Sequence, residues 1–448
     1  MPVMYSFESG ICQTSVIIYK KNVGICLEDL IIVHLLWADD LLLVTDSILG
    51  MQKQLDGLKK FCALNHMILN AIKTKIMVFG KHKRDEVKVY FNGRIIDLVD
   101  AYKYLGNLIT AIHIATGDIF SQQYPYLINK ARGALFALKR KLHGLGDVPP
   151  RIFLFLFQHM IEPILLYGAE IWGTSNKGTR QIDTFYLSFI KSLLKVKPST
   201  SNIITNGEVG CIPTGVKCHI RALCYYIRVK RMSNDCLLKK AFNQLVSLQE
   251  VGFPTWIGRI YKLASKYNIH LESMSKDKNY KSHCKLHVTN QYISNWFTSL
   301  NDIKTNPLLR TYVTWKDHFM FETYLEAVKK PKYRNAISRL RASSHNLMIE
   351  YGRHHALPLD QRICKTCSLL EDEKHLVISC HSHSIGRYVL FSKISNHYPC
   401  FMSLSDNDKF SFLFKSADPQ VLTWLGKFIY NAMKDRDSRV DCNATESV

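Results

Sequence analysis

The chain has 448 residues, 47% of them hydrophobic and 11% aromatic, so it can bury about two or three ordinary cores and is not expected to be disordered. Lysine and arginine outnumber aspartate and glutamate by 59 to 37, which gives a formal net charge of +22 spread along the chain. A surface of this sign attracts polyanions, so nucleic acid is the favoured partner; the alternatives are an anionic membrane or a merely solvated lysine-rich surface.

No segment has the pattern of a secretory signal or a membrane span. The first ten residues lack a basic region and a continuous apolar region. The most apolar stretches, 30–44 and 152–167, contain charged residues and fall short of the ~20 apolar residues that a span requires. The thirteen cysteines are odd in number and irregularly spaced, which favours a reducing compartment. We therefore expect an intracellular protein, nuclear or cytoplasmic, that is not secreted and has no membrane partner.

Residues 1–110 alternate short apolar runs with turn residues, as in mixed α/β structure. Two buried strands are predicted over 30–37 and 41–45, joined by a tight turn at Asp39-Asp40. Ser47 should cap a helix whose apolar stripe comprises Ile48, Met51, Leu55, Leu58 and Cys62.

Further along this segment, short strands are predicted over 67–69 and 76–79. Asn92-Gly93 lies between the apolar runs 87–91 and 94–96, and it predicts a hairpin because both residues tolerate the positive φ of a type I′ turn.

Between residues 123 and 345 the apolar pattern changes to the 3.6-residue period of helices. Pro149-Pro150 separates two predicted helices. Their apolar stripes are Leu127, Ala131, Ala134, Leu135 and Leu138, then Ile152, Phe155, Leu156, His159 and Met160. After about residue 345, His and Cys cluster, so a further unit is expected to begin near Tyr351.

The adjacent aspartates Asp39 and Asp40 interrupt an apolar segment, where their charge would be costly to bury without compensation. Carboxylate oxygens at a hairpin tip suit Mg²⁺, and two such ions catalyse nucleotidyl transfer in polymerases. The alternative is an ordinary acidic turn facing solvent, which Asp-Asp alone would favour.

The longer stretch 35–81 carries the sequence Trp-Ala-Asp-Asp, a helix with Gln that ends in Phe-Cys, and Leu-Asn-x-x-Lys-Thr-Lys before an apolar strand. It resembles the palm of non-LTR (LINE-type) retrotransposon reverse transcriptases. In the family's order, Tyr104-Leu105-Gly106 resembles the primer-grip segment, 129–141 the first thumb helix, and 162–173 the Pro-x-x-x-Tyr-Gly-x-Glu-x-Trp segment. The resemblance extends over residues 25–235 and is weak over 236–345.

This resemblance implies that Asp39 and Asp40 are metal ligands and that Lys73 lies beside the incoming triphosphate. From the residues alone, Lys73 is one of several loop lysines. The sequence also departs from the family: His66 stands where glycine is usual, which puts the loop geometry in doubt. The family's upstream segments, one of which carries another catalytic Asp, have no counterpart in residues 1–38. Two-metal chemistry uses that third carboxylate, so we expect weak Mg²⁺ binding and a chain that is inactive alone as an RNA-directed DNA polymerase.

The C-terminal cysteines and a histidine form the pattern C-x₂-C-x₇-H-x₄-C, comprising Cys364, Cys367, His375 and Cys380. Four such ligands suit tetrahedral zinc and leave no open position, so the ion would stabilise the fold without activating water. The alternative is a chance grouping in a His-rich stretch. The resemblance favours zinc, because many of these elements end in a similar segment.

These features predict an α+β protein in four parts: an incomplete polymerase palm with an antiparallel sheet (1–110), a thumb-like helical region (123–245), a helical connection (246–345) and a small C-terminal unit with the zinc segment (351–448). The leading hypothesis is a truncated reverse-transcriptase-like protein that binds RNA and DNA without sequence preference. The alternatives are a nucleic-acid-binding or assembly module similar to an RNA chaperone, and a polymerase that is active only when another chain completes it.

Overall fold

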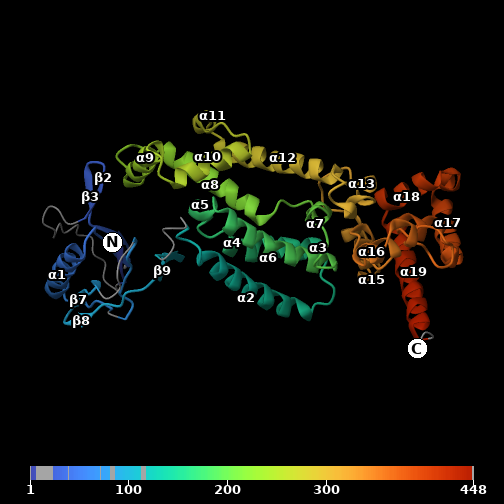
Figure 1. The fold of residues 1–448 in the computed structure, drawn as a ribbon, viewed down its shortest axis with the longest axis horizontal. Coiled ribbons are helices and arrows are strands. Elements are labelled where there is room, and N and C mark those ends of the chain that lie inside the picture. Colours follow the sequence, from blue (N-terminus) through green and yellow to red (C-terminus); the bar gives the residue numbers. More distant parts are fainter. Residues whose placement is uncertain are drawn as a thin grey trace. The chain divides into compact units, whose positions relative to one another are not determined.

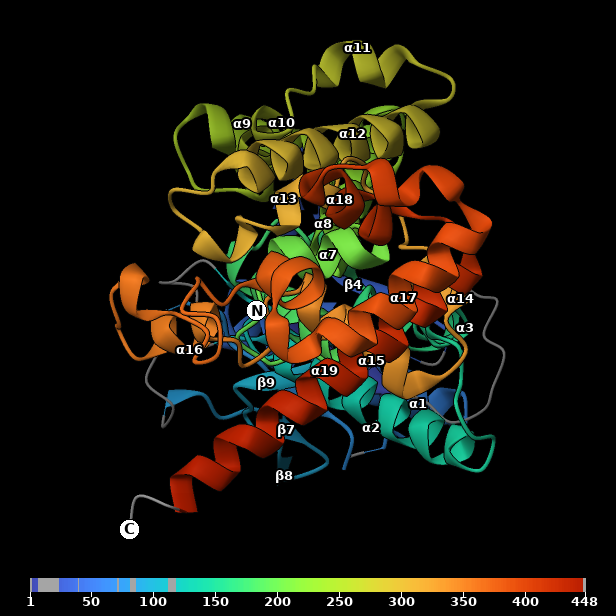
Figure 2. The ribbon, with the colours of Figure 1, turned by 90° about the vertical axis from the view of Figure 1, so that its right-hand side faces the viewer.

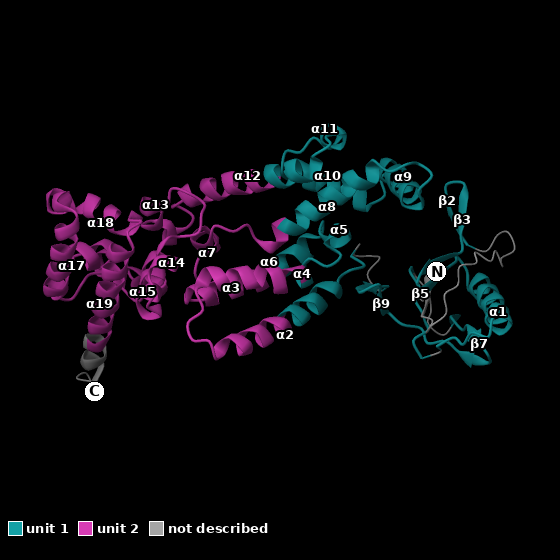
Figure 3. Cartoon of the chain, turned by 180° about the vertical axis from the view of Figure 1, so that it is seen from behind, with its two compact units in different colours: residues 1–131, 164–182, 217–287 teal, residues 132–163, 183–216, 288–448 magenta. Residues whose placement is uncertain are grey.

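The computed structural model describes residues 24–38, 40–70, 72–80, 86–111 and 118–438 in full, and residues 2–6 and 439–445 as backbone. Helices predominate and the strands form small antiparallel sheets, so the α+β class is confirmed (Figure 1). The chain divides into two compact units (Figure 3). Unit 1 comprises 1–131, 164–182 and 217–287; unit 2 comprises 132–163, 183–216 and 288–448.

Unit 1 contains a four-stranded sheet of order β4-β5-β1-β6. Its strands are β1 (Pro2–Ser6), β4 (His34–Trp37), β5 (Asp40–Val44) and β6 (Lys75–Ile76). The predicted acidic hairpin is β4–β5, in which Trp37 pairs with Asp40. The first strand is not buried as predicted: β4 lies at the sheet edge, and Leu36 and Trp37 are 55% and 67% exposed. An edge strand is flanked on one side only, which explains this difference.

The predicted strand 30–37 is also divided in two. Its first part, β3 (Leu30–Ile32), forms a separate two-stranded sheet with β2 (Ile25–Leu27). Continuous apolar character therefore indicated strand structure correctly but did not specify the pairing.

Helix α1 (Ile48–Leu64) follows the hairpin and confirms the predicted cap. The Ser47 side chain accepts a 3.2 Å hydrogen bond from the Gly50 amide, which satisfies one of the free N–H groups of the first turn. The buried face contains four of the five predicted residues, Met51, Leu55, Leu58 and Cys62, and packs in a core with Leu43 of β5.

The helix ends in a left-handed residue, His66, whose φ is +53°. His66 stands where the family that the sequence resembles usually has glycine. It adopts a left-handed conformation, in which histidine is several-fold enriched among non-glycine residues. The strand predicted over 67–69 is wrong. The Met67 amide instead donates to the Cys62 carbonyl (2.9 Å), so this segment continues the helix cap.

Two further hairpins complete the β structure of unit 1. The predicted one is confirmed in shorter form, with β7 (Tyr90–Phe91), β8 (Arg94–Ile95) and positive φ at both Asn92 and Gly93. The second, β9 (Ala101–Tyr104) with β10 (Asn107–Thr110), turns at Leu105-Gly106, again with positive φ at both turn residues. Each therefore has the φ signs of a type I′ turn, which matches the twist of the flanking strands.

Helices make up the remainder of unit 1, together with parts of five helices that cross the unit boundaries. Those inside the unit are α5 (Ala169–Trp172), α9 (Leu237–Glu250), α10 (Trp256–Lys266) and α11 (Leu271–Lys276). Those that cross are α2 (Gln123–His143), α4 (Glu162–Leu165), α6 (Asn176–Leu194), α8 (Thr214–Lys230) and α12 (Tyr280–Asn301). Among the described helices, none has the length and apolar composition needed to cross a lipid bilayer.

Unit 2 is built from helices. Its N-terminal part contains α3 (Pro150–Leu156), a π-helical turn η3 (Phe157–Ile161) and α7 (Asn202–Val209). Later come η4 (Pro307–Leu309), α13 (Tyr312–Trp315), α14 (Tyr324–Ala327), α15 (Pro331–Arg341), α16 (Met348–His354) and η5 (Leu359–Gln361). The C-terminal elements are η6 (His375–Ser379), η7 (His381–His383), α17 (Ser384–His397), η8 (Pro399–Ser403), α18 (Asp406–Lys415) and α19 (Pro419–Thr445).

The apolar residues predicted to face the core from α2 are buried, apart from Ala134, which is half-buried. The buried face predicted for the next helix, α3 with η3, is wrong. Ile152, Phe155 and Met160 are each more than half exposed, whereas Leu154, Phe157 and Ile161 are buried. This segment is apolar on most of its circumference, so periodicity could not select the face. The π-helical turn then changes the period from 3.6 residues.

The core of unit 2 is organised around α15 and α19, which pack against each other (Figure 2). A Cβ at Gly426 would lie 2.9 Å from the Tyr333 carbonyl oxygen, so the close approach of these helices requires glycine there. Beside them, the fully buried Arg341 guanidinium binds the carboxylates of Glu208 and Glu322. This buried network balances its charges, because Lys316 also pairs with Glu322.

Candidate metal centre and acidic hairpin

The structure describes only part of the acidic hairpin. Asp39 lies outside the described residues, whereas Asp40 is half-buried at the first position of β5. Burial, and then the negative charge of Asp40, raise the pKa of the Tyr102 and Tyr104 hydroxyls on β9. Asp40 therefore lies within electrostatic reach of two tyrosines that are about sixty residues later in the chain.

Lys73 belongs to the loop before β6, and Asn70 organises this loop. The Asn70 side-chain oxygen accepts hydrogen bonds from the amides of Ile72 (3.2 Å) and Lys73 (3.1 Å), forming an Asx turn. The Lys73 carbonyl in turn accepts a 2.9 Å hydrogen bond from the Tyr102 hydroxyl. Tyr102 thus contacts the backbone of the lysine loop, and its hydroxyl feels the charge of Asp40.

Sequence reasoning named Tyr104 as part of the segment that resembles the primer grip, but it did not single out Tyr102. The signal was present as the alternation Tyr-Lys-Tyr, which places both rings on one face of a strand. Both rings line a small cavity of about 60 Å³ whose other walls are apolar apart from Lys75; they comprise Leu42, Met77, Phe79, Val99 and Ile109.

The Cys/His cluster is brought together as predicted. One ligand atom from each of Cys364, Cys367, His375 and Cys380 lies within 4.8 Å of all the others. The Cys380 sulfur is 3.9 Å from each of the other two sulfurs. Tetrahedral zinc with Zn–S distances of ~2.3 Å holds its sulfurs about 3.8 Å apart, so the separation fits this ion.

Two short local structures position these ligands. Cys364 and Cys367 flank a tight turn in which the Cys364 amide donates to the Leu369 carbonyl at 2.7 Å. His375 begins the π-helical turn η6, where its amide donates to the Asp372 carboxylate at 2.7 Å. At the other end of η6, the Cys380 amide returns a 2.8 Å hydrogen bond to the His375 carbonyl.

The electrostatics of the cluster suit a cation. Burial lowers the pKa of His375, so the ring is neutral near pH 7, and its buried Nε2 has no hydrogen-bond partner among the described residues. A neutral imidazole nitrogen with a free lone pair is the form that binds zinc. Three thiolates and Zn²⁺ carry one net negative charge, and the buried Arg387 guanidinium, which donates to the Cys380 carbonyl (2.6 Å), lies close enough to offset it. The cluster can therefore bind zinc.

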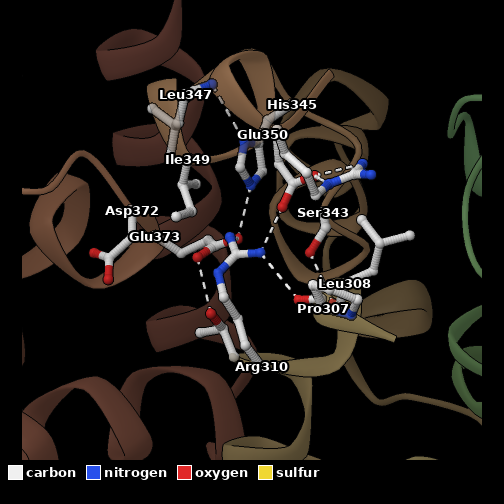
Figure 4. A network of polar contacts seen from close by, with 12 residues as sticks. Pro307, Leu308, Arg310, Ser343, His345, Leu347, Ile349, Glu350, Asp372 and Glu373 are labelled. Carbon is white, nitrogen blue, oxygen red and sulfur yellow. Dashed lines mark hydrogen bonds and ion pairs between the residues drawn. The ribbon is translucent and has the colours of Figure 1, made fainter. Parts of the chain in front are cut away.

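A buried polar network adjoins the cluster through Glu373, two positions before His375 (Figure 4). The Arg310 guanidinium pairs with the buried carboxylates of Glu350 (2.5 Å) and Glu373 (2.8 Å). His345 and Thr311 add hydrogen bonds of 2.9 Å to Glu373. Burial opposes ionisation of Glu373, but His345 and Arg310 lower its pKa to about 2. The network therefore fastens the cysteine-histidine segment to the helices that precede it.

Comparisons with known proteins identify a transposon link. No family model matches the chain. The chain is 30% identical over 148 residues to a putative uncharacterized transposon-derived protein of Caenorhabditis elegans, an alignment that covers 32% of this chain and 50% of that protein. The chain thus spans about half the length of the curated relative that it matches. This similarity indicates a transposon origin.

Proposed function

We propose that this chain is a nucleic-acid-binding protein derived from the reverse transcriptase of a non-LTR retrotransposon, and that it does not synthesise DNA on its own. The transposon-derived relative and the positive charge of +22 support this proposal. Binding then depends on neutralisation of phosphates, and the protein binds RNA and DNA with little preference for their sequence.

The observation that carries the polymerase ancestry is the convergence of three separate segments. The hairpin with Asp40, the loop with Lys73 and the strand β9, which leads into the Leu105-Gly106 turn, meet around the Tyr102 side chain. Its hydroxyl donates to the Lys73 carbonyl, and its ring lines a cavity with Leu42 of β5. In the family that the sequence resembles, the corresponding segments supply the metal site, the triphosphate-binding lysine and the primer grip. An unrelated acidic turn would not require these three segments to meet.

The composition of β1 supports weak metal binding. β1 pairs with β5 and places Ser6 opposite Asp40 in register. None of the five residues of β1 is acidic. Any Mg²⁺ held by Asp39 and Asp40 alone would be weakly bound, with its remaining positions filled by water or phosphate.

A second candidate is a polymerase completed by another chain. The exposed side chains of Leu36 and Trp37 on β4, the outermost strand of the sheet that the structure describes, favour it, because a sheet edge with exposed apolar residues can accept a further strand. In this case DNA synthesis would depend on the added chain.

Binding is tested by titrating labelled RNA and DNA of several sequences with the full chain, while fluorescence anisotropy is measured across a range of salt concentrations. We expect log K to fall linearly with log salt, with similar affinities for different sequences. A complex that is insensitive to salt, or no complex at low salt, contradicts the proposal.

A further inference from the structure

A cleft of about 770 Å³ in unit 2 lies outside both candidate metal sites. Four parts of the chain form it: the segment after α6, helix α15, residues 344–346 that follow α15, and helix α19. Five cationic side chains line it, namely Lys195, Lys197, Lys332, Arg339 and Lys434. Among its described lining residues, Asp437 is the one carboxylate, and its oxygen lies 3.5 Å from the Arg436 guanidinium. The cleft is therefore strongly positive.

The contacts of these cations do not neutralise their charges. The Lys197 ammonium donates to the carbonyl of His345 (3.3 Å) and to the side-chain oxygen of Asn346 (2.8 Å), both uncharged acceptors. Arg339 donates to the Lys195 carbonyl at 3.0 Å, which fixes the guanidinium beside the Lys195 backbone. Like charges gathered in one concavity repel each other, so folding this arrangement costs free energy unless an anion is bound.

Two further features define the class of anion. Tyr430 lines the cleft, and the Lys332 ammonium lies 5.1 Å from its ring centroid, so an aromatic surface stands beside the cations. A neighbouring cavity of about 290 Å³ shares Lys195 and Asn335 with the cleft and adds Lys139, while its carboxylate, Asp147, is paired with Arg334. The positive surface thus extends over more than one phosphate, and a groove that combines cations with an aromatic ring is typical of sites for nucleic acid strands.

We infer that this cleft binds the phosphodiester backbone of a nucleic acid strand, with Lys195, Lys332, Arg339 and Lys434 as the phosphate ligands. This inference rests on the proposed function and assigns the binding of nucleic acid to this cleft. The geometry of the cleft derives from the packing of α15 on α19 at Gly426, so the lysines are held on two helices and one helix end.

The test compares two triple variants of the full chain that lose the same charge. The first is Lys195→Gln/Lys332→Gln/Lys434→Gln, in the cleft. The control is Lys304→Gln/Lys393→Gln/Lys427→Gln, three exposed lysines of unit 2 that do not line the cleft. Binding of labelled single-stranded RNA and of duplex DNA is measured by anisotropy across salt concentrations, and thermal unfolding verifies that both variants fold.

We expect the cleft variant to lose about tenfold or more in RNA affinity at low salt and the slope of log K against log salt to fall by about 2, since each lost phosphate contact contributes ~0.7. The control variant should lose less than about threefold. Bound RNA should also protect Lys195, Lys332 and Lys434 from acetylation more than the control lysines. Equal losses of RNA affinity in the two variants, without such protection, overturn the assignment of the cleft as the binding site but leave the proposed function standing. Absence of wild-type binding overturns both.

Discussion

The Tyr167 hydroxyl donates a 2.7 Å hydrogen bond to the carbonyl oxygen of Leu105, 62 residues earlier in the chain. The contact joins two segments that resemble conserved parts of reverse transcriptases, the Tyr-Gly segment and the turn between β9 and β10. A Cβ at Gly106 would lie 2.7 Å from the same hydroxyl. The turn therefore needs glycine for two reasons, its positive φ of +80° and the close approach of Tyr167.

Removal of this hydroxyl should loosen the β9–β10 hairpin. In Tyr167→Phe we expect a loss of about 0.5–1.5 kcal/mol in the free energy of unfolding, the usual contribution of one hydrogen bond. Amides of residues 101–110 should also exchange faster with deuterium. Tyr388→Phe is the control, because Tyr388 is 74% exposed. If the two variants exchange alike in this hairpin, the bond does not position it.

Loss of one sulfur ligand should release zinc and destabilise the segment around it. Native mass spectrometry of the full chain should find one zinc, absent in Cys367→Ser but retained in Cys400→Ser, whose substituted cysteine is exposed and outside the cluster. Because four protein ligands fill the coordination sphere, the ion acts on folding, and its loss should increase protease cleavage near residues 359–383. A wild-type chain that is metal-free and equally resistant to cleavage contradicts the zinc assignment.

Arg341→Met should be among the most damaging substitutions in unit 2. It leaves the fully buried carboxylate of Glu208 without its main counter-charge, which costs about 3–5 kcal/mol in the free energy of unfolding. Adding Glu208→Gln should recover part of this loss. Arg151→Met removes a pair whose side chains are 57% and 49% exposed, and should cost at most about 1 kcal/mol. The free energy of unfolding is measured in urea for the wild type, Arg341→Met, Arg341→Met/Glu208→Gln and Arg151→Met. Similar losses in Arg341→Met and Arg151→Met would refute the role of the buried network.

The same network makes stability depend on pH. Burial alone would raise the pKa of Glu208, but Arg341 and Lys316 hold it below its ordinary value. A carboxyl whose pKa is lower in the folded state stabilises the fold at pH values above the unfolded pKa of about 4.3, and this contribution is lost as the pH falls. We expect the urea midpoint to decline below about pH 4.3, with a shallower decline in Glu208→Gln. An identical decline in both proteins would contradict this assignment.

Features set by neighbouring residues were predictable from the sequence. The Ser47 cap, the Asn92-Gly93 turn and the spacing of the Cys/His cluster each depend on residues close together in the chain, so local chemistry sufficed. The acidic hairpin was also predicted, although the exposure of β4 was not, because burial depends on which strands pair beside it.

Features set by distant residues were not predictable in this way. Glu208 and Arg341 are 133 positions apart, and no sequence pattern marks them as partners. Tyr102 of β9 lines one cavity with Leu42 of β5, 60 positions earlier, and no sequence pattern marks them as neighbours. The helix around Phe157 was assigned the wrong face, because apolar residues surround it and a π-helical turn alters its period.

The proposal that this chain derives from a reverse transcriptase and binds nucleic acid without extending it is tested on one primed RNA template. The full chain is incubated with labelled primer, deoxynucleotides and Mg²⁺ or Mn²⁺, and the products are separated on a native gel for binding and on a denaturing gel for extension. We predict a salt-sensitive mobility shift and a primer of unchanged length. Primer extension that disappears in Asp39→Ala, or the absence of a mobility shift at low salt, would contradict the proposed function.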